Sequence, residues 1–214
     1  MANMIAAFMF IIFMNSFLDT FGESTKPAFC RETRECFTFQ TLCQTKDYDV
    51  RSYKASVWAG TEMKGRLAAT VTAFWRLFRY IQGKNEGGVK INMTAPVITK
   101  VSEDASRQKK SKMYFLLPAA YQDTPPVPTD SDVFIENFPP LTVFVNSFGG
   151  WMTSSKEKKQ LKALADSLNN DQQKYFASVT YSAGYNSPME LTNRHNEVWY
   201  EADGQPKCNG NNRK

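Results

Sequence analysis

The single histidine is the first residue whose type could do chemistry. His195 is the one imidazole among 214 residues, so a catalytic triad or a histidine-ligated metal would have to use it. Its neighbours Asn193, Arg194 and Asn196 are polar and typical of an exposed turn. We therefore interpret His195 as a solvated loop residue and keep it as the single candidate metal ligand.

The carboxylates show no pattern for acid–base catalysis. Glu32 with Glu35, and Asp47 with Asp49, lie in segments that flank the expected folded region. The sequence also lacks the G-x-S-x-G, P-loop and H-E-x-x-H motifs of common enzyme classes. We expect no enzymatic activity.

The four cysteines indicate disulfides. Cys30, Cys36 and Cys43 lie near the amino terminus, and Cys208 lies in the polar tail 204–214. Their spacings differ from the C-x2-C hooks of zinc sites. An even number of cysteines in a secreted chain favours disulfides, and all three pairings of four cysteines stay open. A bridge to Cys208 would tie the two ends of the domain together.

The first 22 residues are similar to a secretory signal peptide. Residues 4–14 read MIAAFMFIIFM, and the small residues Thr20 and Gly22 precede the expected cleavage. This run is too short for a membrane span, which needs about 20 apolar residues. The alternative is a buried N-terminal helix, although such helices are usually amphipathic. We expect an extracellular, secreted protein without a transmembrane anchor.

One N-glycosylation sequon is consistent with passage through the secretory pathway. Asn92-Met93-Thr94 is an N-glycosylation sequence. Residues 89–101 have the pattern of a strand, whereas sequons in use favour surface loops. Asn92 is therefore a glycosylation candidate whose occupancy stays open.

Composition and charge favour one folded domain. Hydrophobic residues make up 42% of the chain, enough for one sizeable core. The net charge is +5, and the basic residues are scattered except in 107–112 and 156–162. Nucleic-acid binders usually concentrate positive charge on one face. We expect no nucleic-acid partner and a monomeric domain over 47–203, preceded by a cysteine-containing extension over 23–46.

The folded region contains the same order of elements twice. A helix is predicted over 66–82, because apolar residues recur there at steps of three and four. Those residues are Leu67, Val71, Phe74, Phe78 and Ile81. Strands over 48–61, 89–101 and 112–117 complete a βαββ unit over 48–117.

The second unit spans 133–202 and follows the proline-rich linker 118–132. Its helix is predicted over 155–168. Its strands are predicted over 133–148 (interrupted by Pro139-Pro140), 178–185 and 197–202. One unit cannot bury both faces of its own sheet, but two facing copies can. We predict an α+β fold, a distorted antiparallel β-barrel of two pseudo-symmetric βαββ repeats with two flanking helices. Such a pair leaves a cleft suited to an apolar ligand.

Six segments together resemble the SOUL haem-binding family. In the family's order they are Gln82–Glu86, Lys90–Val97, Ser131–Glu136, Phe148–Gly150, Ala183–Pro188 and Asn196–Trp199. They extend over about 48–200, which is most of the mature chain. The family's fold is a distorted barrel of two βαββ repeats, in agreement with the periodicity.

The resemblance implies a non-catalytic protein that binds haem, porphyrin or a similar hydrophobic ligand in a shallow apolar groove beside the first helix. Val71 and Glu190 stand where tetrapyrrole-binding members often have basic residues, and Ser52 stands where some have histidine. These differences keep an alternative open. The chain could be an extracellular protein-interaction module that retains the SOUL fold without tetrapyrrole binding.

The groove that the resemblance implies lies between the first helix and the loop before the last strand. Its expected ligand-binding residues are Val71, Phe74, Phe78, Arg79, Met189, Leu191 and Arg194. Phe74 and Phe78 would lie under the macrocycle, and Arg79 or Arg194 would pair with its carboxylates.

Overall fold

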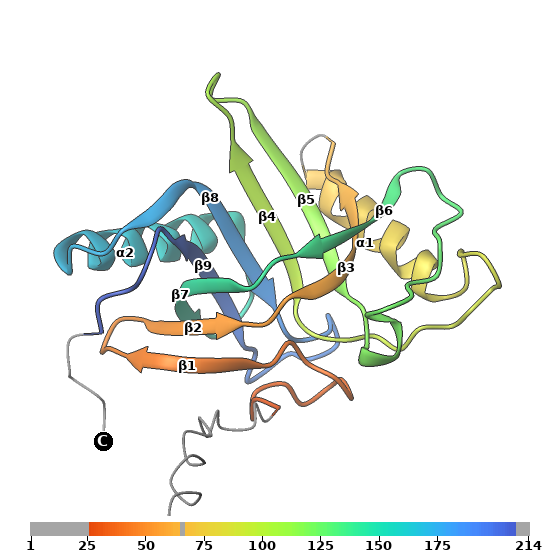
Figure 1. Cartoon of the computed structure of the whole chain (residues 1–214), viewed down its shortest axis with the longest axis horizontal. Coiled ribbons are helices and arrows are strands. Elements are labelled where there is room, and N and C mark those ends of the chain that lie inside the picture. The colour runs from red at the N-terminus through yellow and green to blue at the C-terminus, as the bar shows by residue number, and fades with distance from the viewer. Residues whose placement is uncertain (1–25, 65–66, 209–214) are drawn as a thin grey trace, which may run out of the picture.

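Two helices pack on one strongly curved antiparallel sheet in the computed structural model, which describes residues 26–64 and 67–208 (Figure 1). The strands are β1 (Phe39–Gln44), β2 (Asp49–Tyr53), β3 (Ser56–Glu62), β4 (Val97–Glu103), β5 (Lys109–Leu116), β6 (Val133–Phe138), β7 (Leu141–Phe148), β8 (Tyr175–Gly184) and β9 (Asn196–Ala202). The helices are α1 (Leu67–Ile81), α2 (Ser154–Asn170) and a short 3-10 turn at Ala119–Tyr121. The predicted α+β class is confirmed.

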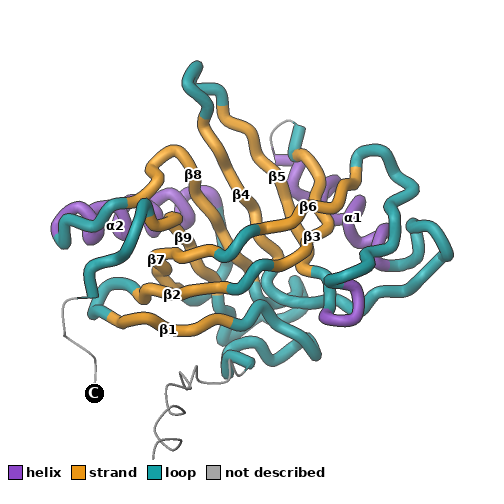
Figure 2. Tube along the Cα trace, viewed as in Figure 1, coloured by secondary structure: helices purple, strands orange, loops and turns teal. Residues whose placement is uncertain are grey.

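Chain order repeats as predicted. The first unit is β2-β3-α1-β4-β5 and the second is β6-β7-α2-β8-β9. Helix α1 contacts β3, β5 and β6, whereas α2 contacts β7 and β9. Figure 2 shows the two helices at opposite ends of the sheet. The units meet where β4 pairs with β8, and again where β2 and β3 pair with β7 and β6.

The strand order is β1-β2-β7-β9-β8-β4-β5-β3-β6, so hydrogen bonds do not close the sheet into a barrel. Chain continuity nevertheless brings its two halves together. One register runs from Asp49 opposite Val145 to Thr61 opposite Val133, so β2 and β3 form one bent strand facing β6 and β7 (Figure 1). Pro139-Pro140 marks the bend because proline cannot donate to the ladder.

The buried side of α1 differs from the predicted stripe. Its buried residues are Ala69, Ala73, Leu77, Tyr80 and Ile81. Val71 and Trp75 are 60% and 51% exposed. Ala73 lets the helix axis approach the sheet closely, so the large residues Phe74 and Phe78 lie at the border of the contact, only partly buried. This border position makes them available to a neighbouring cavity.

Residues 89–96 are irregular, so the predicted strand over 89–101 is wrong in its first half. The Asn85 side chain fixes the preceding turn by accepting from the Val89 N–H at 2.9 Å and donating to the Tyr80 carbonyl at 2.9 Å. Further on, the Thr94 hydroxyl donates to the Leu116 carbonyl at 2.7 Å. Asn92 is exposed in this segment.

Two disulfides use all four cysteines, and the described residues contain no free cysteine. Cys30 pairs with Cys36, and Cys43 pairs with Cys208. The predicted disulfides are therefore confirmed, including the bridge that ties the C-terminal tail to the start of the domain. The extension also adds β1 to the sheet, an edge strand that the sequence analysis did not predict.

The two ends of the chain lie outside the described residues. The expected signal peptide, 1–22, lies outside the described residues, as do residues 209–214 of the tail. Within the described part, no helix is long and apolar enough to cross a membrane. The same described residues contain no group of three or more potential metal-ligating side chains.

Candidate ligand pocket

A cavity of about 440 Å³ lies between α1 and the turn that follows β8. Phe74 and Phe78 from α1 form part of its wall, with ring centroids 5.9 Å apart and planes 14° from parallel. The remaining lining residues are Glu32, Thr33, Arg34, Asn92, Met93, Thr94, Ala95, Val97, Gly184, Tyr185, Asn186, Ser187 and Pro188. Three separate parts of the chain therefore join α1 in building one pocket.

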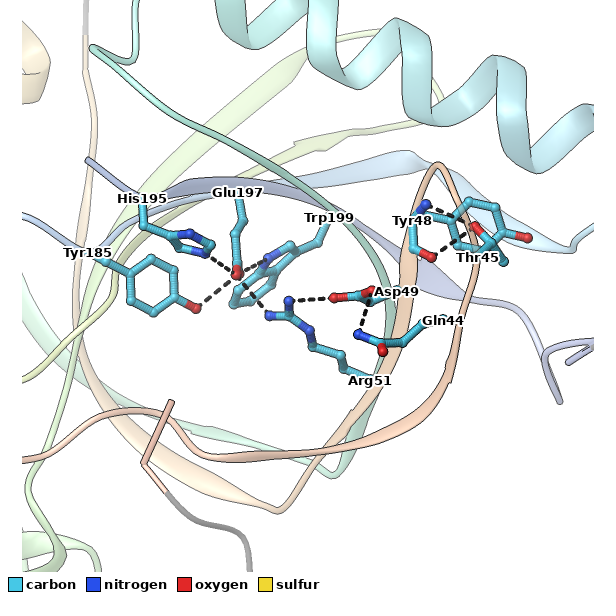
Figure 3. Close-up of polar contacts among 9 residues, drawn as sticks. All are labelled: Gln44, Thr45, Tyr48, Asp49, Arg51, Tyr185, His195, Glu197 and Trp199. Atoms are coloured by element: carbon cyan, nitrogen blue, oxygen red, sulfur yellow. Dashed lines mark hydrogen bonds and ion pairs between the residues drawn. The ribbon is translucent and has the colours of Figure 1, made fainter. Parts of the chain in front are cut away.

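Tyr185 is held in the pocket wall by a buried carboxylate. Its hydroxyl donates to one oxygen of Glu197 at 2.9 Å, and the Trp199 indole N–H donates to the same oxygen at 2.8 Å. The other Glu197 oxygen contacts Arg51 Nη1 and His195 Nε2, at 2.8 and 2.7 Å. Figure 3 shows these four side chains converging on Glu197.

Electrostatics keep Glu197 and Tyr185 each in one protonation state near neutral pH. Burial alone would raise the pKa of Glu197, but the hydrogen bond from His195 and the charge of Arg51 lower it to about 2. Burial and the Glu197 charge raise the pKa of Tyr185 well above its ordinary value. Tyr185 therefore stays a hydroxyl donor, and Glu197 stays a carboxylate.

His195 is not the solvated loop residue that the sequence indicated. Its side chain is only 20% exposed, and its ring stacks on Phe29 with centroids 3.7 Å apart. One ring nitrogen is occupied by Glu197, and His195 is not among the pocket-lining residues. Its visible role is to position Glu197 and, through it, Tyr185.

The loop 186–195 contains a second organising residue. Arg194 donates to the backbone carbonyls of Ser187 and Glu190, at 2.7 and 2.6 Å, and its guanidinium lies 4.2 Å from the Trp151 ring centroid. A third bond goes to the Asn186 carbonyl. The guanidinium is thus occupied in shaping the turn that borders the pocket.

Of the seven expected ligand-binding residues, the structure brings Phe74 and Phe78 to the pocket. Met189 and Leu191 are 87% and 72% exposed on the loop. Arg79 lies 4.0 Å from Asp130 on the outer part of α1. These three residues, together with Val71 and Arg194, do not line the cavity.

The sequence did not predict that residues 32–34 of the N-terminal extension form one wall of the pocket. The sole pointer was the group of cysteines in this extension, which predicted disulfides without saying which residues pair or where the loop would lie. It also missed that the sequon Asn92 stands at the pocket.

Fold and pocket together define an α+β domain of two βαββ repeats, with an apolar cavity beside the first helix. The chain belongs to the SOUL heme-binding protein family, whose family model matches residues 34–201. The family expected from the sequence is therefore confirmed.

Named relatives agree with that assignment. Human "Heme-binding protein 2" is 41% identical over 167 residues, covering 76% of this chain and 82% of that protein. Mouse "Heme-binding protein 1" is 33% identical over 156 residues, covering 71% and 82%.

Solved structures share the fold alone. The EcmrR C-terminal domain has a TM-score of 0.52 at 8% identity, covering 76% of this chain and 98% of that one. A hydrolase from Listeria innocua has a TM-score of 0.51 at 10% identity, covering 75% and 94%.

Proposed function

We propose that this protein binds haem or a related tetrapyrrole non-covalently, without catalysis, in the pocket beside α1. The observation that carries the proposal is the pair of nearly parallel rings, Phe74 and Phe78, on one wall of the cavity. The volume of about 440 Å³ falls within the range of small-molecule sites. The names of the human and mouse relatives, each a heme-binding protein, support the ligand class.

The pocket residues suit a ligand held by burial of its ring. Phe74, Phe78 and Val97 supply apolar surface, which attracts a flat aromatic macrocycle. His195 is turned to Glu197, and the Tyr185 hydroxyl donates to the same carboxylate. Met93 is the remaining pocket side chain with an atom that binds haem iron in other proteins. We infer that ring burial provides most of the affinity, so metal-free protoporphyrin binds nearly as tightly as haemin.

We also propose that binding takes place outside the cell. Both disulfides are of the kind that persists in oxidising compartments, and they use every cysteine of the chain. The apolar run of residues 4–14 supplies the secretory signal in this proposal.

Titration with haemin, followed by the Soret band, tests the function. Phe78→Asp is expected to abolish binding, because it places a carboxylate beneath the apolar ring. Val71→Asp is the matched control, since Val71 is on the same helix but exposed and outside the cavity. Circular dichroism of both variants checks that they fold. Equal binding by Phe78→Asp and the wild type would refute the proposed site.

A second function, a protein-interaction module, is favoured by one observation. Val71 and Trp75, one turn apart on α1, are 60% and 51% exposed and form an apolar pair on the surface. This alternative predicts that haemin and protoporphyrin both fail to bind the correctly folded wild type.

A further inference from the structure

One wall of the pocket comes from the N-terminal edge of the region that matches the family model. The family model begins at residue 34, whereas the loop closed by the Cys30–Cys36 disulfide begins before it. Glu32, Thr33 and Arg34 of this loop line the cavity. The first part of the disulfide loop therefore lies before the matched region, against the pocket that the repeats build.

Contacts fix the loop to both sides of the cavity. On one side, the Phe37 N–H donates to the Ala95 carbonyl at 2.8 Å, beside a bridge between Cys36 and Ala95. On the other side, Glu32 accepts from the Asn186 side chain at 2.6 Å and from the Ser187 N–H at 3.0 Å. The loop thus spans the pocket from residue 95 to the turn after β8.

A stacked ring adds a third attachment. Phe29 lies on the His195 ring, and Arg31 donates to the Asn193 carbonyl at 3.2 Å. The Cys30–Cys36 bridge joins this attachment to the one at Ala95, because Cys30 follows Phe29 and Cys36 pairs with Ala95. Without the bridge, the segment between the two attachments would gain conformational freedom.

The two charged residues of the pocket wall differ in what occupies them. Burial acts to raise the pKa of Glu32, but hydrogen bonds from Asn186 and Ser187 and the charge of Arg194 lower it overall. The Glu32 carboxylate therefore already accepts hydrogen bonds from the protein itself. Arg34 is exposed, and in the described part of the chain its guanidinium has no hydrogen-bond or ion-pair partner.

Arg34 also borders a second cavity, of about 530 Å³, on the other side of the loop. Lys26 and Lys54 line that cavity as well, and its one carboxylate, Glu35, accepts from the Ala119 N–H, so net positive charge extends away from the apolar pocket in this direction. An acidic group at the edge of a ring bound against Phe74 and Phe78 would meet Arg34 first and this basic region behind it.

We propose that the Cys30–Cys36 loop is a specificity element that presents Arg34 to a carboxylate of the bound tetrapyrrole. The inference rests on the proposed function and deepens it, because it names the ligand class as an apolar ring carrying at least one acidic side chain. A guanidinium can hold a carboxylate through two parallel hydrogen bonds, which gives orientation as well as affinity.

The test compares protoporphyrin IX with its dimethyl ester on the full secreted protein, by fluorescence titration. Arg34→Gln is expected to weaken binding of the diacid about tenfold and to leave the ester unchanged, since only the diacid offers a charged partner. Arg79→Gln is the matched control, because Arg79 lies on α1 outside the cavity; its two affinities should equal those of the wild type.

The disulfide is tested with the double variant Cys30→Ser/Cys36→Ser. We expect it to lose the preference for the diacid, whereas Cys43→Ser/Cys208→Ser should keep the preference while lowering stability. An unchanged ratio of diacid to ester affinity in Arg34→Gln would overturn this inference alone. Failure of the folded wild type to bind either porphyrin would overturn the proposed function and the inference together.

Discussion

Glu197 offers the sharpest test of how the pocket wall is held. Glu197→Gln preserves shape but removes the charge opposite Arg51, and both residues are buried. Lowering the pKa of Glu197 from 4.5 to about 2 corresponds to about 3 kcal/mol of stabilisation at neutral pH. Removing one partner of a buried ion pair costs about 3–5 kcal/mol. We therefore expect a loss of about 3–5 kcal/mol.

The sign of the pH dependence follows from the lowered pKa. The stabilisation is fully present above pH 4.5 and is lost as the pH falls toward about 2, where Glu197 protonates in the folded state. The difference between the wild type and Glu197→Gln should accordingly shrink over that interval.

Urea unfolding followed by tryptophan fluorescence measures both effects. Thermal unfolding at neutral pH should in addition show a melting temperature lower by about 10 °C, given the size of the domain. Glu201→Gln is the control: Glu201 is partly exposed and accepts one 3.3 Å bond from Tyr181, so its loss should stay below about 1 kcal/mol. A loss below 1 kcal/mol in Glu197→Gln would refute the cluster as the support of Tyr185.

Four further outcomes are expected. Expression in animal cells should release a form starting near Glu23, as read by N-terminal sequencing; retention of Met1 on cytosolic protein would contradict the signal peptide. That form should contain no alkylatable thiol, and Cys43→Ser/Cys208→Ser should lose up to about 4–5 kcal/mol of stability, from the long loop that this bridge closes. If Asn92 is glycosylated, amidase digestion should shift the gel mobility of the wild type but not of Asn92→Gln. Finally, His195→Ala should change haemin affinity little, and disappearance of the Soret shift in that variant would point to iron ligation.

The repeats and helix positions were predictable because their signals are local. Apolar spacing over 66–82 and 155–168 indicated both helices within two residues of their observed ends. The side that α1 buries was not predictable in the same way. Two apolar stripes overlap on this helix. The stripe through Ala73 and Leu77 packs against the sheet, because its small residues allow a close approach. Phe74 and Phe78 of the other stripe therefore border the pocket and Val71 faces solvent, whereas Ile81 is buried with Ala73 and Leu77.

The pocket was only partly predictable, because most of its geometry comes from contacts between distant segments. Nothing near His195 in the sequence indicates that Phe29 covers its ring. Arg194 has the right charge for a ligand carboxylate, yet backbone carbonyls of its own loop occupy it. Arg34 has no local signal at all, and it reaches the pocket because a disulfide and an anchored carboxylate hold its loop there.

Ring-current shifts give the most direct test that a tetrapyrrole lies against α1. Metal-free protoporphyrin would be added to protein with labelled phenylalanine rings, assigned through single Phe→Leu variants. We predict large shifts for Phe74 and Phe78, the two ring residues of α1 in the pocket wall. Phe176, exposed on β8 and outside the cavity, should not move. Saturable binding that shifts Phe176 while leaving Phe74 and Phe78 unchanged would contradict the proposed site.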